Sequence, residues 1–439
     1  MKENKPEKET RKSNSKQFTR REFLGASGAV IAVTALSSSL LDACKSTTST
    51  STTSTTTTPA SNNLRIGVLV ALTGSGASVG VLEWQECQWA ANIINAGGWI
   101  NSTPGITVNG KQYMVEVVAE DVQSTSDGVQ SAATKAIYED KVDFIAGPSG
   151  PFAVSATSVT EPAQKLRAIG FCTDTPGQFG ADTPFTFLAH NSTVEHAGIA
   201  MQYLKKNYPT VKNVALVNAD DGSIQYVEPL VTKLLSDNGI TVLGKLIGYP
   251  NDIVDFSPIV SQILALNPDA VIVANAYYVH FASILKLVRA AGSNIPVGTG
   301  SVGGGNDVIT IAGAAASTDF FCTGITPDLA TDPNSPQLLI KMINDMQSTY
   351  GASRTIVAQN SQAVFLIAEA VQAAQSFDPA TVRDKWATLG TMNTFYGTGK
   401  IGGLKTYGIN HAVSHVEPIV VLDKGQVKSG GWYDPGIIP

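Results

Sequence analysis

The chain has 439 residues, of which 43% are hydrophobic and 15% charged, and its net charge is −6. This length exceeds one compact core, so two lobes or domains behind a leader are expected. Residues 1–43 hold eight basic and five acidic side chains, which leaves 22 basic and 31 acidic ones for the remainder. Such an acidic body lacks the basic face that nucleic acid requires, which excludes nucleic-acid binding as a function.

Cysteines and histidines are few and scattered in the sequence. The four cysteines are Cys44, Cys87, Cys172 and Cys322. Their spacing fits neither a disulfide framework nor a zinc site, and the sequence leaves open whether any of the last three are bridged. His411 and His415 stand four residues apart without the glutamate of a zinc-protease helix, so a surface or packing role is expected. We therefore predict no metal and no cofactor.

The first 43 residues have the pattern of an export signal. A charged, polar start leads to Thr19-Arg20-Arg21-Glu22-Phe23-Leu24, and a weakly apolar stretch follows from Gly25 to Leu41. A twin arginine followed by Phe-Leu resembles the twin-arginine (Tat) export signal, although Gly25 stands where a basic residue is usual. The apolar stretch is short for a membrane span. We predict a signal peptide over residues 1–43.

Leu41-Asp42-Ala43-Cys44 resembles a lipobox, in which a small residue precedes the cysteine that becomes the lipidated N-terminus. Asp42 is atypical at its position. Every residue from Ser46 to Thr58 is Ser or Thr, and such a tract cannot bury enough apolar surface to fold. Residues 44–63 are therefore predicted to be a flexible tether between a lipid anchor at Cys44 and the folded body.

From Leu64 onward, short apolar strands alternate with helical patterns. In chain order we predict a strand at Leu64–Leu72, a helix with Trp84, Cys87, Ala91 and Ile94 on one face, a strand at Tyr113–Ala119, a helix around Ser131–Tyr138, a strand at Val142–Ala146, a helix at Val154–Leu166 and a strand at Ala168–Thr173. The order repeats with a helix at Ala197–Lys206, then Val214–Asn218, Val227–Leu235, Ile240–Ile247, Ile259–Leu266 and Ala270–Asn275, a helix at Phe281–Ala291 and a strand at Pro296–Gly298.

This alternation predicts an α/β protein with parallel sheets and right-handed crossovers. One sheet of more than ten strands is unusual, so two similar Rossmann-like lobes are favoured. Ligands of such sheets bind beyond the carboxyl ends of the strands, which points to the loops Thr73–Ser78, Gly147–Phe152 and Cys172–Pro176. Near the C-terminus, Asp423-Lys424-Gly425 between Pro418–Leu422 and Gln426–Lys428 predicts a hairpin.

The chain resembles the substrate-binding proteins of ABC transporters for branched-chain amino acids, amides and related solutes. The resemblance runs from about Leu64 to Asp434 and rests on passages that are weak singly but fall in the family's order. These passages are Leu72-Thr73-Gly74, Asn95-Ala96-Gly97-Gly98, Glu120-Asp121, Lys141-Val142-Asp143-Phe144-Ile145-Ala146-Gly147-Pro148, Asn267-Pro268-Asp269, Leu287-Val288-Arg289-Ala290-Ala291-Gly292 and Phe395-Tyr396-Gly397-Thr398-Gly399.

The resemblance implies a type I periplasmic-binding fold, in which three segments cross between two lobes that close on a ligand. By analogy the crossings are expected near Ala189–Thr193, Thr323–Asp328 and Phe395–Lys400. The N-terminal lobe would comprise residues 64–190 and 326–395, and the C-terminal lobe residues 191–325 and 396–439. The resemblance also implies a monomer outside the cytoplasm, a small-molecule ligand, an ABC permease as partner, and no enzymatic activity.

The resemblance places several ligand-binding candidates in the N-terminal lobe. The loop after the third strand would offer Ser149 and Gly150, with Pro151 where a serine is usual. The loop after the fourth strand would offer Cys172, Thr173 and Asp174, and Asp174 is either a ligand contact or a turn residue before Pro176. Ser75 and Trp84 match positions that face the cleft, although Trp84 equally suits core packing.

In the C-terminal lobe the candidates are Asp221, Tyr226, Tyr277, Tyr278, Gly300 and Ser301. Amino-acid binders of this family have an acid that pairs with the ligand's amino group, and Gly300 matches its position. Unless Asp174, Asp221 or Asp307 substitutes, an amino acid would lack this partner, and the ligand would be an amide, a carboxylate or an aromatic acid.

Two other classes of protein remain as alternatives. A ligand-sensing receptor module would use the same cleft, and the chain does not distinguish it from a transport protein. An NAD-linked enzyme is the remote alternative, because Gly74, Gly76 and Gly80 do not match the spacing of the dinucleotide fingerprint.

Overall fold

A computed structural model describes residues 63–99, 102–150, 153–171, 177–220, 222–352 and 354–435. The chain divides into two units, and all these residues belong to the second, Ala60–Pro439. The predicted signal peptide, Cys44 and nearly all of the tether lie outside the described residues. Five predicted site residues also lie outside them, namely Pro151, Cys172, Thr173, Asp174 and Asp221. No helix in the described part of the chain has both the length and the apolar character needed to span a membrane.

The first lobe is built on a nine-stranded sheet of order β13-β14-β15-β6-β5-β4-β1-β3-β2. Its strands are β1 (Asn63–Val70), β2 (Ile106–Val108), β3 (Lys111–Asp121), β4 (Phe144–Ala146), β5 (Arg167–Ile169), β6 (Thr186–Leu188), β13 (Thr391–Thr394), β14 (Gly397–Gly402) and β15 (Ala412–Ser414). The strands from β3 to β15 pair in parallel, and antiparallel strands close both edges.

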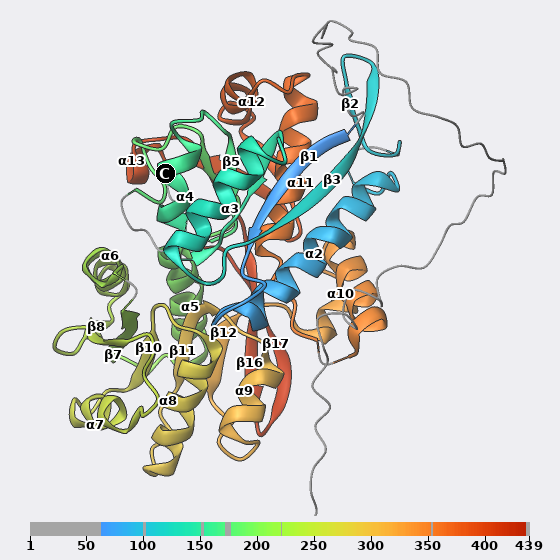
Figure 1. The fold of residues 1–439 in the computed structure, drawn as a ribbon. Coiled ribbons are helices and arrows are strands. Elements are labelled where there is room, and N and C mark those ends of the chain that lie inside the picture. The colour runs from blue at the N-terminus through green and yellow to red at the C-terminus, as the bar shows by residue number, and fades with distance from the viewer. Residues whose placement is uncertain are drawn as a thin grey trace, which may run out of the picture. The chain divides into compact units, whose positions relative to one another are not determined.

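Helices cover both faces of this sheet (Figure 1). Side chains of β1 alternate between the faces, as in any strand. Ile66 and Val68 pack with α2 (Ala77–Asn95) and α11 (Gln359–Ala374), whereas Leu69 packs with α3 (Ser126–Tyr138) and α4 (Ala153–Thr160). The lobe also contains η2 (Pro327–Ala330), α10 (Gln337–Tyr350), α12 (Pro379–Trp386) and α13 (Leu404–Tyr407). Burial on both faces explains why β1 is an almost uninterrupted apolar run.

The second lobe contains an eight-stranded sheet of order β17-β16-β12-β11-β10-β7-β8, with β9 also paired to β7. Its strands are β7 (Asn213–Asp220), β8 (Thr241–Val242), β9 (Ile247–Pro250), β10 (Ala270–Val273), β11 (Val297–Val302), β12 (Phe320–Thr323), β16 (Glu417–Asp423) and β17 (Gln426–Tyr433). β16 and β17 form the hairpin predicted from the sequence, and β16 joins β12 in antiparallel pairing.

Both faces of the second sheet are covered as well. Val214 and Leu216 pack with α5 (Thr193–Asn207) and α6 (Ile224–Asp237). Ala215 and Val217 contribute to the opposite core, with α7 (Ser257–Ala265), α8 (Tyr278–Ala290) and α9 (Gly305–Ala312). The predicted α/β class with two lobes of mainly parallel sheet is therefore confirmed.

The chain passes between the sheets at residues 189–192, 324–326 and 415–416. The third crossing predicted at Phe395–Lys400 is wrong, because Thr394 pairs with Gly397 in a tight hairpin between β13 and β14. Gly397 adopts a φ of 99°, which suits glycine at this turn. The glycine-rich run is thus an edge hairpin, and residues 397–414 belong to the first lobe instead of the second.

Two predicted elements are shorter than expected. The helix predicted at Val154–Leu166 ends at Thr160, just before Pro162, whose ring disfavours helical backbone in the preceding residue. The strand predicted at Ile240–Ile247 divides into β8 and β9, and Gly244 between them has a φ of 70°.

The packing of α12 on the first sheet gives a test of the core. Trp386 is fully buried, and its ring stacks on Phe187 with the centroids 4.3 Å apart. We expect Trp386→Ala to lower the free energy of unfolding by about 3–5 kcal/mol, because it removes a large buried side chain and leaves a cavity. Tyr138→Ala, at a side chain that is 62% exposed, should change it by less than about 0.5 kcal/mol. Urea unfolding monitored by circular dichroism measures the free energy of unfolding of both variants. Equal decreases would contradict the assignment of Trp386 to the core.

Candidate functional site

A cavity of about 620 Å³ lies between the two lobes, at the carboxyl ends of their strands. The first lobe contributes the end of β1, the start of α2, the loop after β4 and the segment before α11. The second lobe contributes residues that follow β10 and β11. The side chains used in the argument below are Glu83, Ser149, Phe171, Tyr277, Tyr278, Ser301, Asp307 and Arg354.

Five of the predicted site residues line this cavity. They are Ser149, Gly150, Tyr277, Tyr278 and Ser301. Tyr277 and Tyr278 stand at the N-terminus of α8, and Phe171 lines the cavity from the first lobe, so aromatic residues contribute from both lobes. Ser301 Oγ accepts a hydrogen bond from the Ala276 backbone N–H at 3.0 Å, which holds the loop after β10 against β11.

Four other predicted residues are absent from the described lining. Ser75 is exposed on the loop before α2, and Tyr226 is half-buried on α6. Trp84 packs against the first-lobe core, the alternative that the sequence left open. Gly300 faces α5, where a Cβ would lie 2.8 Å from the backbone nitrogen of Ala197.

The orientation of Gly300 corrects the ligand argument made from the sequence. Strand β11 packs on α5 at this point, so a side chain at residue 300 would collide with the helix instead of entering the cavity. The absence of an acid at this position therefore carries no information about the ligand. Asp307, one of the proposed substitutes, does line the cavity, and its Oδ2 accepts a hydrogen bond from Thr355 Oγ1 at 2.5 Å. This bond joins α9 of the second lobe to the first lobe.

Glu83 is a cavity residue that the sequence analysis missed. It lies on α2 next to Trp84, is 6% exposed, and its Oε1 atom has no hydrogen-bond partner among the described residues. Burial, and then the nearby Glu86 charge, raise the pKa of Glu83 to about 8. The available signal was a pair of acids, Glu83 and Glu86, one turn apart on the helix that follows the first strand.

Glu86 has a different role from Glu83. Its Oε1 lies 2.9 Å from Arg354 Nη1, and its two oxygens accept hydrogen bonds from the backbone of Val357 and Ala358 at 3.0 and 2.7 Å. Arg354 Nη2 also donates to Leu82 O at 3.1 Å. This buried pair fixes α2 against the segment before α11, and the positive charge of Arg354 is matched within the protein.

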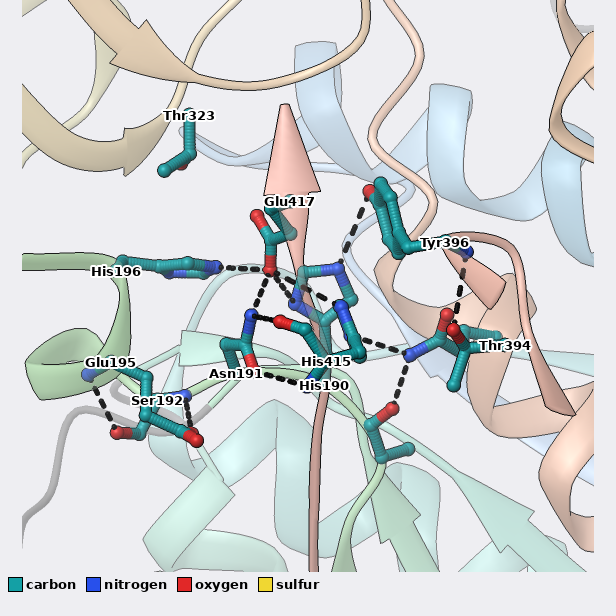
Figure 2. A network of polar contacts seen from close by, with 12 residues as sticks. His190, Asn191, Ser192, Glu195, His196, Thr323, Thr394, Tyr396, His415 and Glu417 are labelled. Atoms are coloured by element: carbon teal, nitrogen blue, oxygen red, sulfur yellow. Dashed lines mark hydrogen bonds and ion pairs between the residues drawn. The ribbon is translucent and has the colours of Figure 1, made fainter. Parts of the chain in front are cut away.

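A second polar cluster lies at the crossings, outside the cavity (Figure 2). We call it the hinge cluster, and its members are His190, Asn191, His196, His415 and Glu417. None is more than 3% exposed. Glu417 Oε1 accepts a hydrogen bond from Asn191 Nδ2 at 2.5 Å and lies 3.0 Å from His196 Nε2. The histidines are scattered in the sequence, but three of them meet in this cluster, because the first and third crossings bring together residues more than 200 positions apart.

The hinge cluster holds a buried negative charge. Burial raises the pKa of Glu417, but His196 and His190 outweigh it and lower that pKa to about 2. Burial lowers the pKa of His190 and of His415. All three pKa values lie below their unfolded values, so the folded cluster binds fewer protons than the unfolded chain. Its contribution to stability is therefore present at neutral pH and is lost on acidification, first below about pH 6.5 for the histidines.

His190, His415 and Glu417 also come close enough to hold a metal ion, with ligand atoms within 4.8 Å of one another. The two ring nitrogens of His415 are already engaged, Nδ1 with Val416 O at 3.1 Å and Nε2 with the Gln362 side chain at 3.0 Å. Gln362 is held in turn by bonds to Ala189 O and the Phe395 N–H. We therefore interpret the cluster as a hydrogen-bonded network.

A sequence model of the periplasmic binding protein family matches residues 63–426. The chain, in which two such lobes enclose a cavity, therefore belongs to this family.

Solved structures with the same fold support this assignment. A leucine binding protein from Thermotoga maritima is 20% identical, with a TM-score of 0.66 over 85% of this chain and 99% of its own. A branched-chain amino acid transporter substrate binding protein from Streptococcus pneumoniae, in complex with isoleucine, is 17% identical, with a TM-score of 0.67 over 85% and 99%. A solute binding protein from Rhodopseudomonas palustris, in complex with 3,4-dihydroxybenzoic acid, is 17% identical, with a TM-score of 0.64 over 86% and 99%. The likeness confirms the type I periplasmic-binding fold.

The hinge cluster gives a test of the crossings. Glu417→Gln should lower the free energy of unfolding by about 3–5 kcal/mol at pH 7, because it removes one partner of a buried charged network. Asp237→Asn, which breaks an exposed ion pair with Lys233, should cost less than about 0.5 kcal/mol. Urea unfolding of both variants measures the difference. A loss for Glu417→Gln no larger than for the control would show that the cluster does not stabilise the crossings.

Proposed function

We propose that this protein is an extracytoplasmic solute-binding protein that captures a small molecule between its lobes and delivers it to an ABC permease. The main support for this proposal is the cavity of about 620 Å³ between the carboxyl ends of the strands of two mainly parallel sheets. This volume lies within the range of small-molecule sites, and the position is where open α/β sheets bind ligands. Membership of the periplasmic binding protein family supports the same function.

Capture requires that the lobes open and close. Three short crossings connect them, and a few residues at such segments can absorb the rotation of a hinge. The bond between Thr355 and Asp307 spans the cavity wall from one lobe to the other, so it is a contact that opening would break. A permease that recognises the closed form would then bind only loaded protein and take up its solute.

The fold alone does not choose among amino acids, amides and organic acids. Relatives of the same fold are described in complex with isoleucine and with 3,4-dihydroxybenzoic acid. A sensor would capture the same solutes, and reconstitution with a permease separates the two roles, because only a transport protein drives uptake into vesicles.

Ligand capture can be tested by thermal shift of residues 62–439 against amino acids, amides, short carboxylates and aromatic acids. A ligand at a hundred times its Kd should stabilise the native state by about 2.7 kcal/mol. Tyr278→Ala should weaken binding about 10–100-fold, because it removes an aromatic wall of the cavity. Tyr138→Ala, at an exposed site on α3, should bind as the native protein does. Equal affinities of the two variants for the ligand would contradict the assignment of the cavity as the binding site.

We also propose that the protein is exported by the Tat route and anchored through a lipid on Cys44, as the leader sequence predicts. Cys44→Ser should release the protein from the membrane pellet into the soluble fraction, since a lipid chain and not the body holds it there. Ser46→Ala should stay in the pellet. Mass spectrometry of the N-terminal peptide identifies the lipid. Pelleting of Cys44→Ser, or an unmodified Cys44, would refute the anchor.

A further inference from the structure

Glu83 lies in the cavity wall with one carboxyl oxygen, Oε1, that has no hydrogen-bond partner among the described residues. Its side chain is 6% exposed, and within the described residues nothing donates a hydrogen bond to Oε1. The neighbouring hydroxyl of Ser149 hydrogen-bonds with the Glu83 carboxyl group, but it donates its single proton to Asn360 Oδ1 at 2.9 Å, so Oε1 is left without a donor. A buried carboxyl oxygen left unpaired costs free energy that a hydrogen-bond donor recovers. A ligand in the cavity can supply that donor.

The charges around the cavity favour a cationic donor. In the described wall the acids and bases are Glu83, Asp307 and Arg354. Arg354 is matched by Glu86 at 2.9 Å, and its Nη2 also donates to Gln85 Oε1 at 3.0 Å. An anionic solute would therefore meet Glu83 and Asp307 without an unmatched cation among the described residues. A cationic solute would meet the Oε1 atom of Glu83, which has no hydrogen-bond partner among the described residues.

An ammonium group satisfies this site better than a hydroxyl group does. Both can donate to Oε1, but only an ammonium also supplies the positive charge that a buried carboxylate needs. We propose that the cavity selects solutes that carry a protonated amine, and that Glu83 anchors this amine. The inference rests on the proposed function, because it assumes that the cavity is the place of capture.

Binding of this kind has a defined proton balance. Burial raises the pKa of Glu83 to about 8, so the empty site holds a proton on the carboxyl at pH 7. When the ammonium binds, the carboxyl ionises and that proton passes to solvent, while the ligand keeps its own. The other groups near Glu83 are Glu86 and Cys87 on α2 and Arg354 on the facing segment. Glu86 and Arg354 form an ion pair, and burial raises the pKa of the Cys87 thiol well above its usual value, so the thiol stays neutral.

Two pH effects follow from this balance. The affinity for an amine should rise about tenfold per pH unit from pH 6 and level off above about pH 8, with about 0.9 protons released per ligand at pH 7. In the empty protein the effect on stability has the opposite sign. The folded state binds the extra proton between about pH 4.5 and 8, so the stability from this group is lost as pH rises through 8.

The test uses pairs with the same carbon skeleton that differ in the amino group: L-leucine with 4-methylpentanoate, and 3-methylbutylamine with 3-methylbutanol, with the corresponding L-phenylalanine pairs in parallel. Calorimetry at pH 6, 7, 8 and 9, in buffers of different ionisation enthalpy, measures affinity and proton release. We expect amines to bind at least 100-fold more tightly than their deaminated partners. Glu83→Gln should weaken the amine about 10–100-fold and abolish both proton release and the pH dependence.

Glu120→Gln is the matched control. Glu120 is also a buried glutamate with a pKa raised to about 7 by burial, but it pairs with Lys135 and does not line the cavity. This variant should bind amines as the native protein does. Comparable weakening in both variants would show that Glu83 acts through the fold, and would overturn the proposal.

The remaining outcomes separate this inference from the proposed function. Tighter binding of a deaminated solute, with an affinity that falls as pH rises, would overturn the amine assignment while the cavity remains a capture site. If the panel does not bind, the native protein is incubated with a cell extract, washed and denatured, and the released solute is identified by mass spectrometry. A solute without an amine would again overturn only this inference. Absence of any captured solute would overturn the proposed function itself.

Discussion

The buried carboxylate of Glu417 is the constraint on which the two-lobe arrangement depends. It lies at the start of β16, directly after the third crossing, and it binds Asn191 and His196 at and just beyond the first crossing. A buried charge is stable only when hydrogen-bond donors surround it. The first and third crossings must therefore stay in the relative position that brings these donors to Glu417. The side chain of Asn191 adds bonds to the backbone of His415 through both its Nδ2 and its Oδ1. Two crossings therefore behave as one tied element, about which the lobes can rotate.

Comparing Glu417 with Glu83 distinguishes a buried glutamate with a structural role from one proposed to bind a ligand. Both are buried glutamates, and burial disfavours the charge of each. At Glu417 the histidines outweigh burial, and the pKa falls to about 2. At Glu83 burial prevails together with the Glu86 charge, and the pKa rises to about 8. The Glu417 carboxylate finds its charged partners within the protein. The Glu83 carboxyl group would find one only in a ligand that carries a positive charge.

The sequence predicted the architecture well because the pattern of apolar runs is local. Strands such as Leu64–Leu72 and Ala270–Asn275 are buried on both faces, and their composition alone indicates this. The third crossing could not be located in the same way, because the glycine-rich run at 397–403 suits a crossing and an edge hairpin equally. Only the pairing of β14 with β13 and β15 decides between them. The hinge cluster was also beyond sequence reasoning, since its members meet through tertiary structure.

The cavity shows why a family position does not transfer to the ligand without geometry. Gly300 was aligned with an acid of amino-acid binders, yet its Cα faces α5, and a Cβ there would approach the helix backbone to 2.8 Å. One residue along the strand, at an irregularity between Thr299 and Val302, Ser301 lines the cavity. Glu83 reaches the same cavity from the opposite lobe, and the only signal for it in the sequence was its spacing from Glu86 on α2. The groups that a ligand meets are therefore set by which side chains point inward from α2 and β11, and among them the unpaired Oε1 of Glu83 favours a ligand that donates a hydrogen bond.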